Sequence, residues 1–407
     1  MRVLFLTSKF PYPLIGGEAI KAYYYLKYLS LSHEVTLLTF TNHHIEPISL
    51  DRIKKLCHSV KIVPRSVRIL SWINSGLAIL SSKPFQVKYY HSRKMREVVN
   101  REINNHKYDL LIVHLIRMFD YVRNYGGCVK IAALEDALSL NYSRQFNYLN
   151  RANRWLVNLE RKRVFQYEKE IIECSRLCLV VSRVDKSFLE KRTGQADKIR
   201  IVPNGVSREL LARGGNKVKE KDWIVFLGNM GSSFFNTGNF PNRDACTFFS
   251  TAVFPRLRQK NKGIKFLIVG ANPSKEIMKL RKIEGVEVTG FTRDPYYYLE
   301  RAKIFVAPLR CGAGIQNKIL EAMALGKAVV TTQIGAEGIE GENDKHFVIV
   351  DKDKPEEMAD RVMDLLKNER NRRYIGENAR GLIKEKYTWD IIGESFLREV
   401  EKITCKV

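Results

Sequence analysis

The sequence predicts an α/β protein built from two doubly wound, Rossmann-like parallel-sheet domains that face each other across a cleft. Three observations support this fold class. Short apolar runs such as Val3–Leu6 alternate with helical patterns along the whole chain. The turn after that first run contains Gly16 and Gly17, a frequent arrangement in the first turn of a strand–helix–strand unit. The same alternation begins again after a polar stretch at 207–222, which we interpret as a linker.

In the first half, strands are expected where short apolar runs end at a polar residue or a turn. These runs are 3–6, 33–40, 60–63, 110–113, 130–134, 177–181 and 199–202. Helical patterns cover 18–31, much of 66–105 and 150–174, and Ser182 is a favourable N-cap for another helix. The first domain is therefore expected to span residues 1–203.

In the second half, the expected strands are 224–228, 265–270, 286–289, 304–307 and 328–332. The expected helices are 243–259, 274–281 and 315–325. This run predicts a second domain over 204–387, and Thr388 is a suitable N-cap for a last helix that begins with Trp389. Ligands of doubly wound sheets bind at the carboxyl ends of the strands, so the cleft between the sheets is the expected site.

The chain has 407 residues, of which 45% are apolar and 28% are charged, and its net charge is +25. Residues 51–100 concentrate this charge, with eleven Lys and Arg against two acidic residues. The imbalance favours an anionic partner, but motifs typical of nucleic-acid binding are missing. We expect a patch that meets anionic lipid, although a solvated helix face would look the same. Its members are Lys54, Lys55, Arg65, Arg68, Trp72, Ile73, Arg93, Lys94 and Arg96.

Other patterns bear on location and metal binding. No apolar run approaches the roughly 18 residues of a membrane-spanning helix, and the first apolar run is too short for a signal peptide. A cytoplasmic protein, peripheral on the inner face of the membrane, is expected. The seven cysteines are scattered, which disfavours a disulfide framework or a zinc site. Asp351 and Asp353 form a D-x-D pattern that we interpret as a helix start, so no metal site is predicted.

Segment 304–332 contains the strongest chemical signal. It predicts a strand, a turn with Gly312 and Gly314, and a helix beginning near Ile315. A helix N-terminus behind a glycine turn favours a phosphate group. Arg310 and Lys318 could neutralise a diphosphate, and Glu321, one turn beyond Lys318, could accept hydrogen bonds from a ribose diol. An ordinary strand–helix turn with a surface Lys and Glu is the alternative interpretation.

The same segment resembles the signature of the family-4 retaining glycosyltransferases, which have the GT-B fold. The block Glu321–Val330, EAMALGKAVV, matches the second half of that signature. The closest resemblance is to bacterial exopolysaccharide sugar transferases. It extends along the chain through FLTSKFPYPLIGGE, His33-Glu34-Val35, IVPNGV at 201–206, PNRDA at 241–245 and GVEVTG at 285–290.

The resemblance implies roles for individual residues. Gly16 and Gly17 would approach the donor diphosphate and the acceptor, and His114 would lie near the transferred sugar. Asn204 and Gly205 would form the interdomain turn, and residues 388–407 would pack back on the first domain. The residues expected to bind the donor are Gly16, Gly17, Gly228, Asn229, Arg243, Gly312, Gly314, Ile315, Gln316 and Glu321. The residues expected to act on the reaction are His114, Arg310 and Lys318.

Two departures from the family pattern stand out. Ala313 occupies the position of the first glutamate, which usually contacts hydroxyls of the donor sugar. Gly228-Asn229 stands where the family usually has Gly-Arg, and the basic Arg and Lys that usually bind the diphosphate are not visible over 228–242, so Arg243, Arg310 and Lys318 are the available substitutes. Residues 231–240, GSSFFNTGNF, look like an insertion that forms either a mobile loop or a decorated turn.

The resemblance implies a retaining, metal-independent hexosyltransferase that uses a nucleotide-diphosphate-sugar and needs no cofactor. The expected acceptor is a glycan or a lipid-linked sugar of cell-surface polysaccharide synthesis. Two alternatives stay open: a GT-B nucleotide-sugar epimerase, and a catalytically lapsed descendant that binds membranes or glycans. Turnover without an acceptor would identify the first, and vesicle binding without nucleotide-sugar turnover would identify the second.

Overall fold

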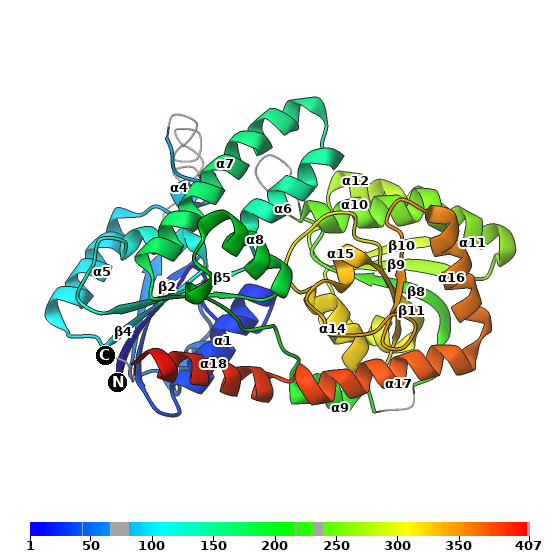
Figure 1. Cartoon of the computed structure of the whole chain (residues 1–407). Coiled ribbons are helices and arrows are strands. Elements are labelled where there is room, and N and C mark those ends of the chain that lie inside the picture. The colour runs from blue at the N-terminus through cyan, green and yellow to red at the C-terminus, as the bar shows by residue number, and fades with distance from the viewer. Residues whose placement is uncertain (43, 66–80, 216–217, 232–238, 405–407) are drawn as a thin grey trace. The chain divides into compact units, whose positions relative to one another are not determined.

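The computed structural model describes residues 1–42, 44–65, 81–215, 218–231 and 239–404 (Figure 1). The chain forms two compact units, which are described in turn. The first comprises Met1–Leu140, Asn158–Val202 and Asp390–Val407. The second comprises Asn141–Val157 and Pro203–Trp389, so a short piece of the first half groups with the second unit.

The first unit contains a seven-stranded sheet in which every pairing is parallel. The strand order is β3-β2-β1-β4-β5-β6-β7. The strands are β1 (Arg2–Thr7), β2 (Glu34–Thr41), β3 (Ser59–Pro64), β4 (Leu110–His114), β5 (Val129–Glu135), β6 (Leu177–Val180) and β7 (Ile199–Ile201). Each expected run forms a strand, because runs of Val, Ile and Leu suit a sheet buried on both faces.

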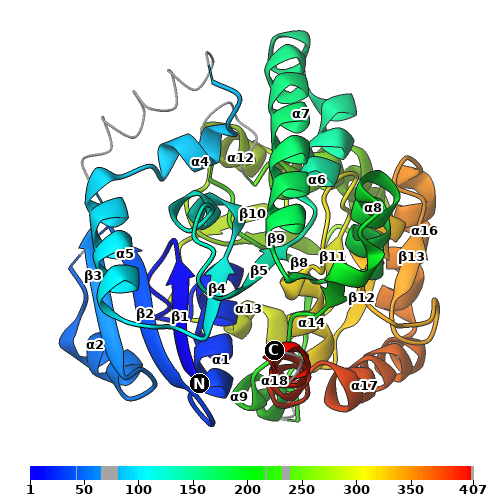
Figure 2. The same ribbon diagram turned by 60° about the vertical axis from the view of Figure 1, so that its left-hand side comes forward.

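Helices surround this sheet (Figure 2). They are α1 (Gly17–Leu29), α2 (Pro47–Lys54), α4 (Phe85–Tyr89), α5 (Arg93–Asn105), η2 (Ile116–Tyr121), α7 (Arg151–Cys174), α8 (Arg183–Thr193), η4 (Ala196–Lys198) and α18 (Trp389–Thr404). Most of α6 (Leu138–Gln145), all of η3 (Phe146–Tyr148) and the start of α7 group with the second unit. Ser182 caps α8 as predicted, since its side chain accepts a hydrogen bond from the Asp185 amide. Residues 66–80, including Arg68, Trp72 and Ile73, lie outside the described residues.

Helix α18 packs against α1 in the first unit. The rings of Tyr25 and Phe396 stack with centroids 3.8 Å apart, and the Tyr28 hydroxyl donates to Asp390 Oδ1 at 2.9 Å. Gly393 faces the Tyr28 ring so closely that any Cβ there would collide with it. These contacts fix the end of the chain on the first helix.

The second unit contains a six-stranded parallel sheet with the order β10-β9-β8-β11-β12-β13. Its strands are β8 (Lys221–Leu227), β9 (Lys265–Val269), β10 (Val286–Gly290), β11 (Ala302–Ala307), β12 (Ala328–Thr332) and β13 (Val348–Val350). Both sheets therefore confirm the predicted doubly wound architecture. The last strand, β13, is only three residues long and was not anticipated.

The helices of the second unit are α9 (Arg208–Arg213), α10 (Phe240–Phe248), η6 (Phe249–Val253), α11 (Phe254–Lys260), α12 (Lys275–Lys279), η7 (Leu280–Lys282), α13 (Tyr296–Arg301), α14 (Asn317–Ala324), α15 (Gln333–Ala336), α16 (Pro355–Lys367) and α17 (Glu369–Lys386). Helix α9 corrects the expected linker at 207–222. Ser207 starts this helix by accepting a hydrogen bond from the Leu210 amide.

Two other expectations about helices need correction. The helix expected over 243–259 is interrupted by the π-turn η6, where the Phe254 amide donates to the Phe249 carbonyl. Pro255 follows, and because it has no amide hydrogen it cannot continue regular α-helical bonding. Helix α16 begins after Lys354 with Pro355 in its first turn, so the D-x-D residues precede its cap.

A close backbone approach places α14, the helix that follows the glycine turn. Gly326 ends the turn between α14 and β12 with φ +68°. Gly376, in α17, lies against it, and a Cβ on Gly376 would stand 2.0 Å from the Gly326 carbonyl oxygen. Only glycine permits this contact, because neither backbone can yield to a side chain.

Two glycines of α17 should respond to alanine in opposite ways. Gly381 has open space around its missing Cβ, so Gly381→Ala should raise the free energy of unfolding by about 0.5–1 kcal/mol through helix propensity. Gly376→Ala should lower it by about 1–3 kcal/mol through overpacking. Urea unfolding of the two variants measures both changes. An equal gain in both would contradict the close approach of α14 and α17.

Candidate functional site

In each sheet the strand order reverses at one point, between β1 and β4 in the first unit and between β8 and β11 in the second. Ligands of open α/β sheets bind where the order reverses, outside the carboxyl ends of the strands. The predicted site residues gather at these two places. His114 ends β4 beside Thr7 of β1, and the glycine turn follows β11 beside Gly228, which follows β8.

The glycine turn of the second unit uses the conformational freedom of its glycines. Gly312 has φ +136° and Gly314 has φ +72°. The following helix α14 begins at Asn317, two residues later than expected, because Gln316 is extended as its N-cap. Ile315 and Gln316 therefore belong to the turn. The Gln316 side chain makes no capping bond, and it donates to the Ala313 carbonyl at 3.2 Å instead.

Lys318 and Glu321 lie in one turn of α14 and are both largely buried. The Lys318 ammonium donates to Gln316 Oε1 at 2.9 Å and lies 5.7 Å from the centre of the Phe226 ring. Burial lowers the pKa of Lys318 to about 8, although Glu321 opposes the change. Burial raises the pKa of Glu321 to about 7, against the opposing effect of Lys318. The turn therefore holds two titratable groups of opposite charge at the start of a helix.

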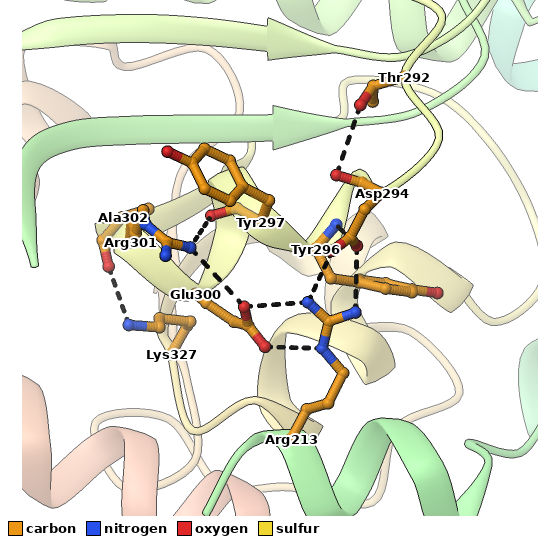
Figure 3. A network of polar contacts seen from close by, with 9 residues as sticks. All are labelled: Arg213, Thr292, Asp294, Tyr296, Tyr297, Glu300, Arg301, Ala302 and Lys327. Carbon is orange, nitrogen blue, oxygen red and sulfur yellow. Dashed lines mark hydrogen bonds and ion pairs between the residues drawn. The ribbon is translucent and has the colours of Figure 1, made fainter. Parts of the chain in front are cut away.

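A second element positions Glu321. Its carboxylate accepts a hydrogen bond from the Tyr296 hydroxyl, a contact that the sequence pattern did not reveal. Arg213 fixes the surrounding turn, as Figure 3 shows, by binding Asp294 and Glu300 together. Its Nε donates to Glu300 Oε1 at 2.7 Å and its Nη1 to Asp294 Oδ1 at 3.1 Å.

Arg310 precedes the glycine turn as predicted, but it already has an acidic partner. Its Nε donates to Asp244 Oδ2 at 2.9 Å, and its Nη2 donates to the other carboxylate oxygen. The guanidinium also lies between aromatic rings, 4.7 Å from Phe248 and 4.8 Å from Tyr148. Arg310 therefore braces the turn, and its positive charge is balanced within the unit.

The residues that follow β8 form a tight polar turn. Gly228 lies against Asn242, and the Asn242 amide donates to the Asn229 carbonyl at 3.0 Å. Asn229 Oδ1 accepts from the Gly231 amide at 2.9 Å. Arg243 is almost fully buried, donates to the Gly231 carbonyl at 2.9 Å, and has a pKa lowered by burial. Of the expected insertion at 231–240, residues 232–238 lie outside the described residues.

Arg144, which lies in α6, contacts the glycine turn after β11, and the sequence analysis did not identify it. Its guanidinium binds both carboxylate oxygens of Glu337, at 2.6 and 2.9 Å, and donates to the Gly312 carbonyl at 2.9 Å. Arg144 and Gly312 are 168 positions apart, and no local pattern connects them. A bidentate Arg–carboxylate pair of this kind fixes the orientation of both partners.

In the first unit, His114 is fully buried at the end of β4. Its Nδ1 lies 3.1 Å from Thr7 Oγ1 and its Nε2 lies 3.2 Å from Glu135 Oε1. Lys21 Nζ lies 3.2 Å from the other Glu135 oxygen and donates to the Val202 carbonyl at 2.9 Å. Burial would raise the pKa of Glu135, but Lys21 and His114 hold it below its usual value.

The backbone beside His114 is strained. Leu115 has φ 72° and ψ 145°, and Glu135 at the end of the neighbouring strand has φ 74°. Non-glycine residues in such conformations cost about 1–3 kcal/mol each and are concentrated at functional sites. Gly16 precedes α1 with φ 84°, and Gly17 begins that helix. Glu18, the next residue of α1, pairs with Arg117 of η2.

The basic residues of 51–100 have mixed surroundings. Arg96 pairs with Asp120, and Arg65 stacks on the rings of Tyr89 and Tyr90 at 4.3 and 4.7 Å. Lys54, Lys55, Arg93 and Lys94 are exposed. Within the described ranges, no helix combines the length and apolar character needed to cross a bilayer. In the same ranges, no three His, Cys, Asp or Glu side chains gather as metal ligands would.

Comparisons with known proteins agree with this geometry. Residues 231–368 match the sequence model of the family described as "Glycosyl transferases group 1". This match includes the glycine turn and α14. The chain is 23% identical over 410 residues to an "uncharacterized 44.6 kDa protein in cps region" of Klebsiella pneumoniae, covering 98% of this chain and 99% of that protein.

Solved structures identify the fold. A sucrose-phosphate synthase from Thermosynechococcus elongatus matches with a TM-score of 0.71 and 14% identity, over all of both chains. HepE of Anabaena, solved in complex with UDP and glucose, matches with a TM-score of 0.65 and 14% identity, over 99% of this chain and 100% of that one. The chain has the fold of GT-B glycosyltransferases. At this identity the likeness extends to the fold alone.

The contact of Arg144 with Glu337 can be measured by a double-mutant cycle within this GT-B fold. The variants are Arg144→Ala, Glu337→Ala and the pair. We expect a coupling free energy of about 1–3 kcal/mol in urea unfolding, because both charged groups are largely buried and share two hydrogen bonds. Glu340→Ala, three residues beyond Glu337, is the matched control. Additive effects of Arg144→Ala and Glu337→Ala would show that the pair is not formed.

Proposed function

We propose that the protein is a group 1 glycosyltransferase that moves a sugar from a nucleotide-diphosphate-sugar to an acceptor hydroxyl with retention of configuration. The observation that carries this proposal is the pair of Lys318 and Glu321 at the start of α14, behind a turn with two left-handed glycines. The family match over 231–368 covers this region, and the structural neighbour from Anabaena was solved with UDP and glucose.

The donor site follows from the charges of the second unit. Backbone amides of the turn and the N-terminus of α14 favour a diphosphate. Lys318 would supply the positive charge, since its ammonium contacts only a neutral amide oxygen at hydrogen-bond distance within the described residues. Glu321, held by Tyr296, would accept hydrogen bonds from the ribose hydroxyls. In this proposal Arg310 and Arg243 bind neighbouring protein groups, Asp244 and the Gly231 carbonyl, and thereby hold the local backbone in place.

The proposed reaction needs little side-chain chemistry. The bond between the anomeric carbon and the diphosphate oxygen breaks while the acceptor oxygen bonds to the same face of that carbon. The acceptor proton passes to the leaving phosphate. Lys318 and the start of α14 stabilise the negative charge that develops on the diphosphate. We propose that these groups do so without a metal ion and that no cofactor takes part.

The first unit would bind the acceptor in this proposal. His114, at the end of β4, has both ring nitrogens near protein groups. We therefore propose that His114 positions Glu135 and the strained turn at Leu115. Gly16 and Gly17 would allow a ligand to approach the start of α1. The cps-region relative from Klebsiella supports an acceptor in surface polysaccharide synthesis. A lipid-linked acceptor would suit the exposed Lys54, Lys55, Arg93 and Lys94, from a cytoplasmic position at the membrane.

Nucleotide binding tests the donor site directly. At about 100 times its Kd, one of UDP, GDP, ADP, TDP or CMP should stabilise the protein by roughly 2.7 kcal/mol in thermal unfolding. Glu321→Ala should remove this gain, and Glu377→Ala, on an exposed face of α17, should keep it. Stabilisation by none of the nucleotides would favour a lapsed glycan-binding descendant, and hydrolysis or isomerisation of a donor without acceptor would favour the epimerase.

The affinity for that nucleotide should depend on pH in a bell-shaped manner. Below about pH 7 Glu321 becomes protonated and loses its charge, and above about pH 8 Lys318 becomes neutral. Both losses weaken binding, so affinity should be greatest between these values. Glu321→Gln should remove the acid limb near pH 7, leaving the titration of the phosphate itself near pH 6. Calorimetric titrations across pH measure both limbs, and an unchanged acid limb in Glu321→Gln would contradict the assignment.

Replacement of His114 should separate turnover from donor binding. His114→Asn should lower kcat by at least about tenfold, because Glu135 loses one of its two partners, while the nucleotide Kd stays within about twofold. His33→Asn, in the turn before β2 of the same unit, is the matched control. A fall in thermal stability with unchanged kcat would assign His114 a structural role alone.

A further inference from the structure

An open polar cavity of about 330 Å³ lies on the surface of the first unit, and its lining contains none of the residues proposed above to bind the donor or to act in transfer. It opens between one face of α5 and the segment from η2 to Tyr125. Its principal lining residues are Arg96, Asn100, Asn104, Asp120, Asn124 and Tyr125. The volume falls at the lower end of the roughly 300–1,000 Å³ typical of small-molecule sites. It suits a ligand of one or two small rings.

Three carboxamides give this cavity its character. Asn100 and Asn104 are four residues apart and share one face of α5 with Arg96. Asn124 comes from the opposite wall, in the turn beyond η2. Across the ranges that the structure describes, none of the three amide side chains has a hydrogen-bond partner. Each amide presents two donor hydrogens and an acceptor oxygen.

The walls behind these amides are fixed. Asp120 binds Lys83 and also Arg96, whose Nη2 donates to it at 3.0 Å. The Tyr121 hydroxyl accepts from the Ser92 amide at 2.8 Å and donates to the Tyr90 carbonyl at 2.5 Å. Opposite the helix, the Tyr125 ring lies over Gly127, where a Cβ would meet its hydroxyl at 2.4 Å. The wall formed by Asp120, Tyr121 and Tyr125 is therefore held in place, whereas the side chains of Asn100, Asn104 and Asn124 are exposed to solvent at its mouth.

The charge pattern restricts the class of ligand. The only charged lining groups are Arg96 and Asp120, and they neutralise each other by direct contact. A phosphate or another small anion would find no unpaired cation among the lining residues. A lipid chain would find little apolar surface, since Ile103 and the tyrosine rings are its apolar parts. A neutral ligand with many hydroxyl groups matches donors and acceptors that point from both walls.

We propose that this cavity binds a neutral sugar residue of a glycan, at a site separate from the residues that would bind the donor. The three carboxamides would exchange hydrogen bonds with adjacent hydroxyls, and the Tyr125 ring would cover one face of the sugar. Such a site would hold a polysaccharide to the first unit independently of transfer. It does not require the proposed transferase activity, because binding needs neither donor nor turnover.

Binding can be observed at the amides themselves. Full-length protein labelled with ¹⁵N at asparagine is titrated separately with glucose, galactose, mannose and N-acetylglucosamine. Each sugar is raised to about 100 mM, a hundredfold above a Kd of about 1 mM. We expect at least one sugar to shift the side-chain amide signals of Asn100, Asn104 and Asn124 with one common Kd. Signals are assigned from single Asn→Asp variants.

Two variants make the result specific. Asn100→Ala combined with Asn104→Ala should weaken binding at least tenfold, because four donor hydrogens and two acceptors are lost. Asn105→Ala, the neighbouring exposed asparagine at the end of α5, should leave the Kd unchanged. Shifts with inorganic phosphate but with no sugar would overturn the proposal in favour of an anion site. No shift at the three amides with any of the four sugars would overturn it outright.

The readout is independent of the donor site. Glu321→Ala should abolish nucleotide binding and leave the sugar-induced shifts at Asn100 and Asn104 intact. Failure of nucleotide binding together with preserved sugar binding would overturn the proposed transferase and keep this inference. Sugar shifts that disappear in Glu321→Ala would instead show that the sugar binds with the donor residues, and would contradict a separate site.

Discussion

Two opposite charges buried in one turn of α14 are the constraint on which the second unit depends. Removing Lys318 and Glu321 from water is unfavourable, and their pKa shifts, in opposite directions, express that cost. The fold offsets the cost with neutral partners: Gln316 for the ammonium and Tyr296 for the carboxylate. The Gly326–Gly376 contact holds the helix where these partners meet it. An incoming diphosphate would therefore meet charges that are already desolvated and oriented.

The other arginines around this turn are used differently. Arg310 and Arg144 each bind a carboxylate in bidentate fashion, and Arg243 is buried against the Gly231 carbonyl. A guanidinium paired in this way fixes the orientation of its neighbours but adds little net positive charge to the site, because the carboxylate offsets it. The large positive charge of the chain thus says little about the donor site. At the proposed donor site the remaining charge is that of Lys318, which among the described residues has no acidic side chain at hydrogen-bond distance.

The sequence allowed the fold to be predicted, and it brought two residues of the candidate donor site together on one helix. Apolar runs of the right length identified twelve of the thirteen strands found among the described residues, and the i, i+3 spacing placed Lys318 and Glu321 together on one helix. The partners could not be predicted, because Tyr296 follows another strand and Arg144 is 168 positions from Gly312. Nor could the sequence show that Arg310 meets Asp244, since the two residues lie 66 positions apart in separate segments. Local sequence patterns show the periodicity of single helices and strands. These contacts instead join residues from separate segments that meet where the strands end.

Ala313 illustrates how such contacts change the meaning of a departure from a family pattern. With Ala313 in the place of that glutamate, residues 308–316 include no Asp or Glu, yet Glu337 brings a carboxylate to the edge of the turn from the end of α15. Arg144 joins that carboxylate to the Gly312 carbonyl, one residue before Ala313. The acid is therefore present but neutralised, and it orders the backbone of the turn. A ligand that reached this edge would have to compete with Arg144 for Glu337, so if the turn binds the donor as proposed, residue 144 would influence recognition together with residue 313.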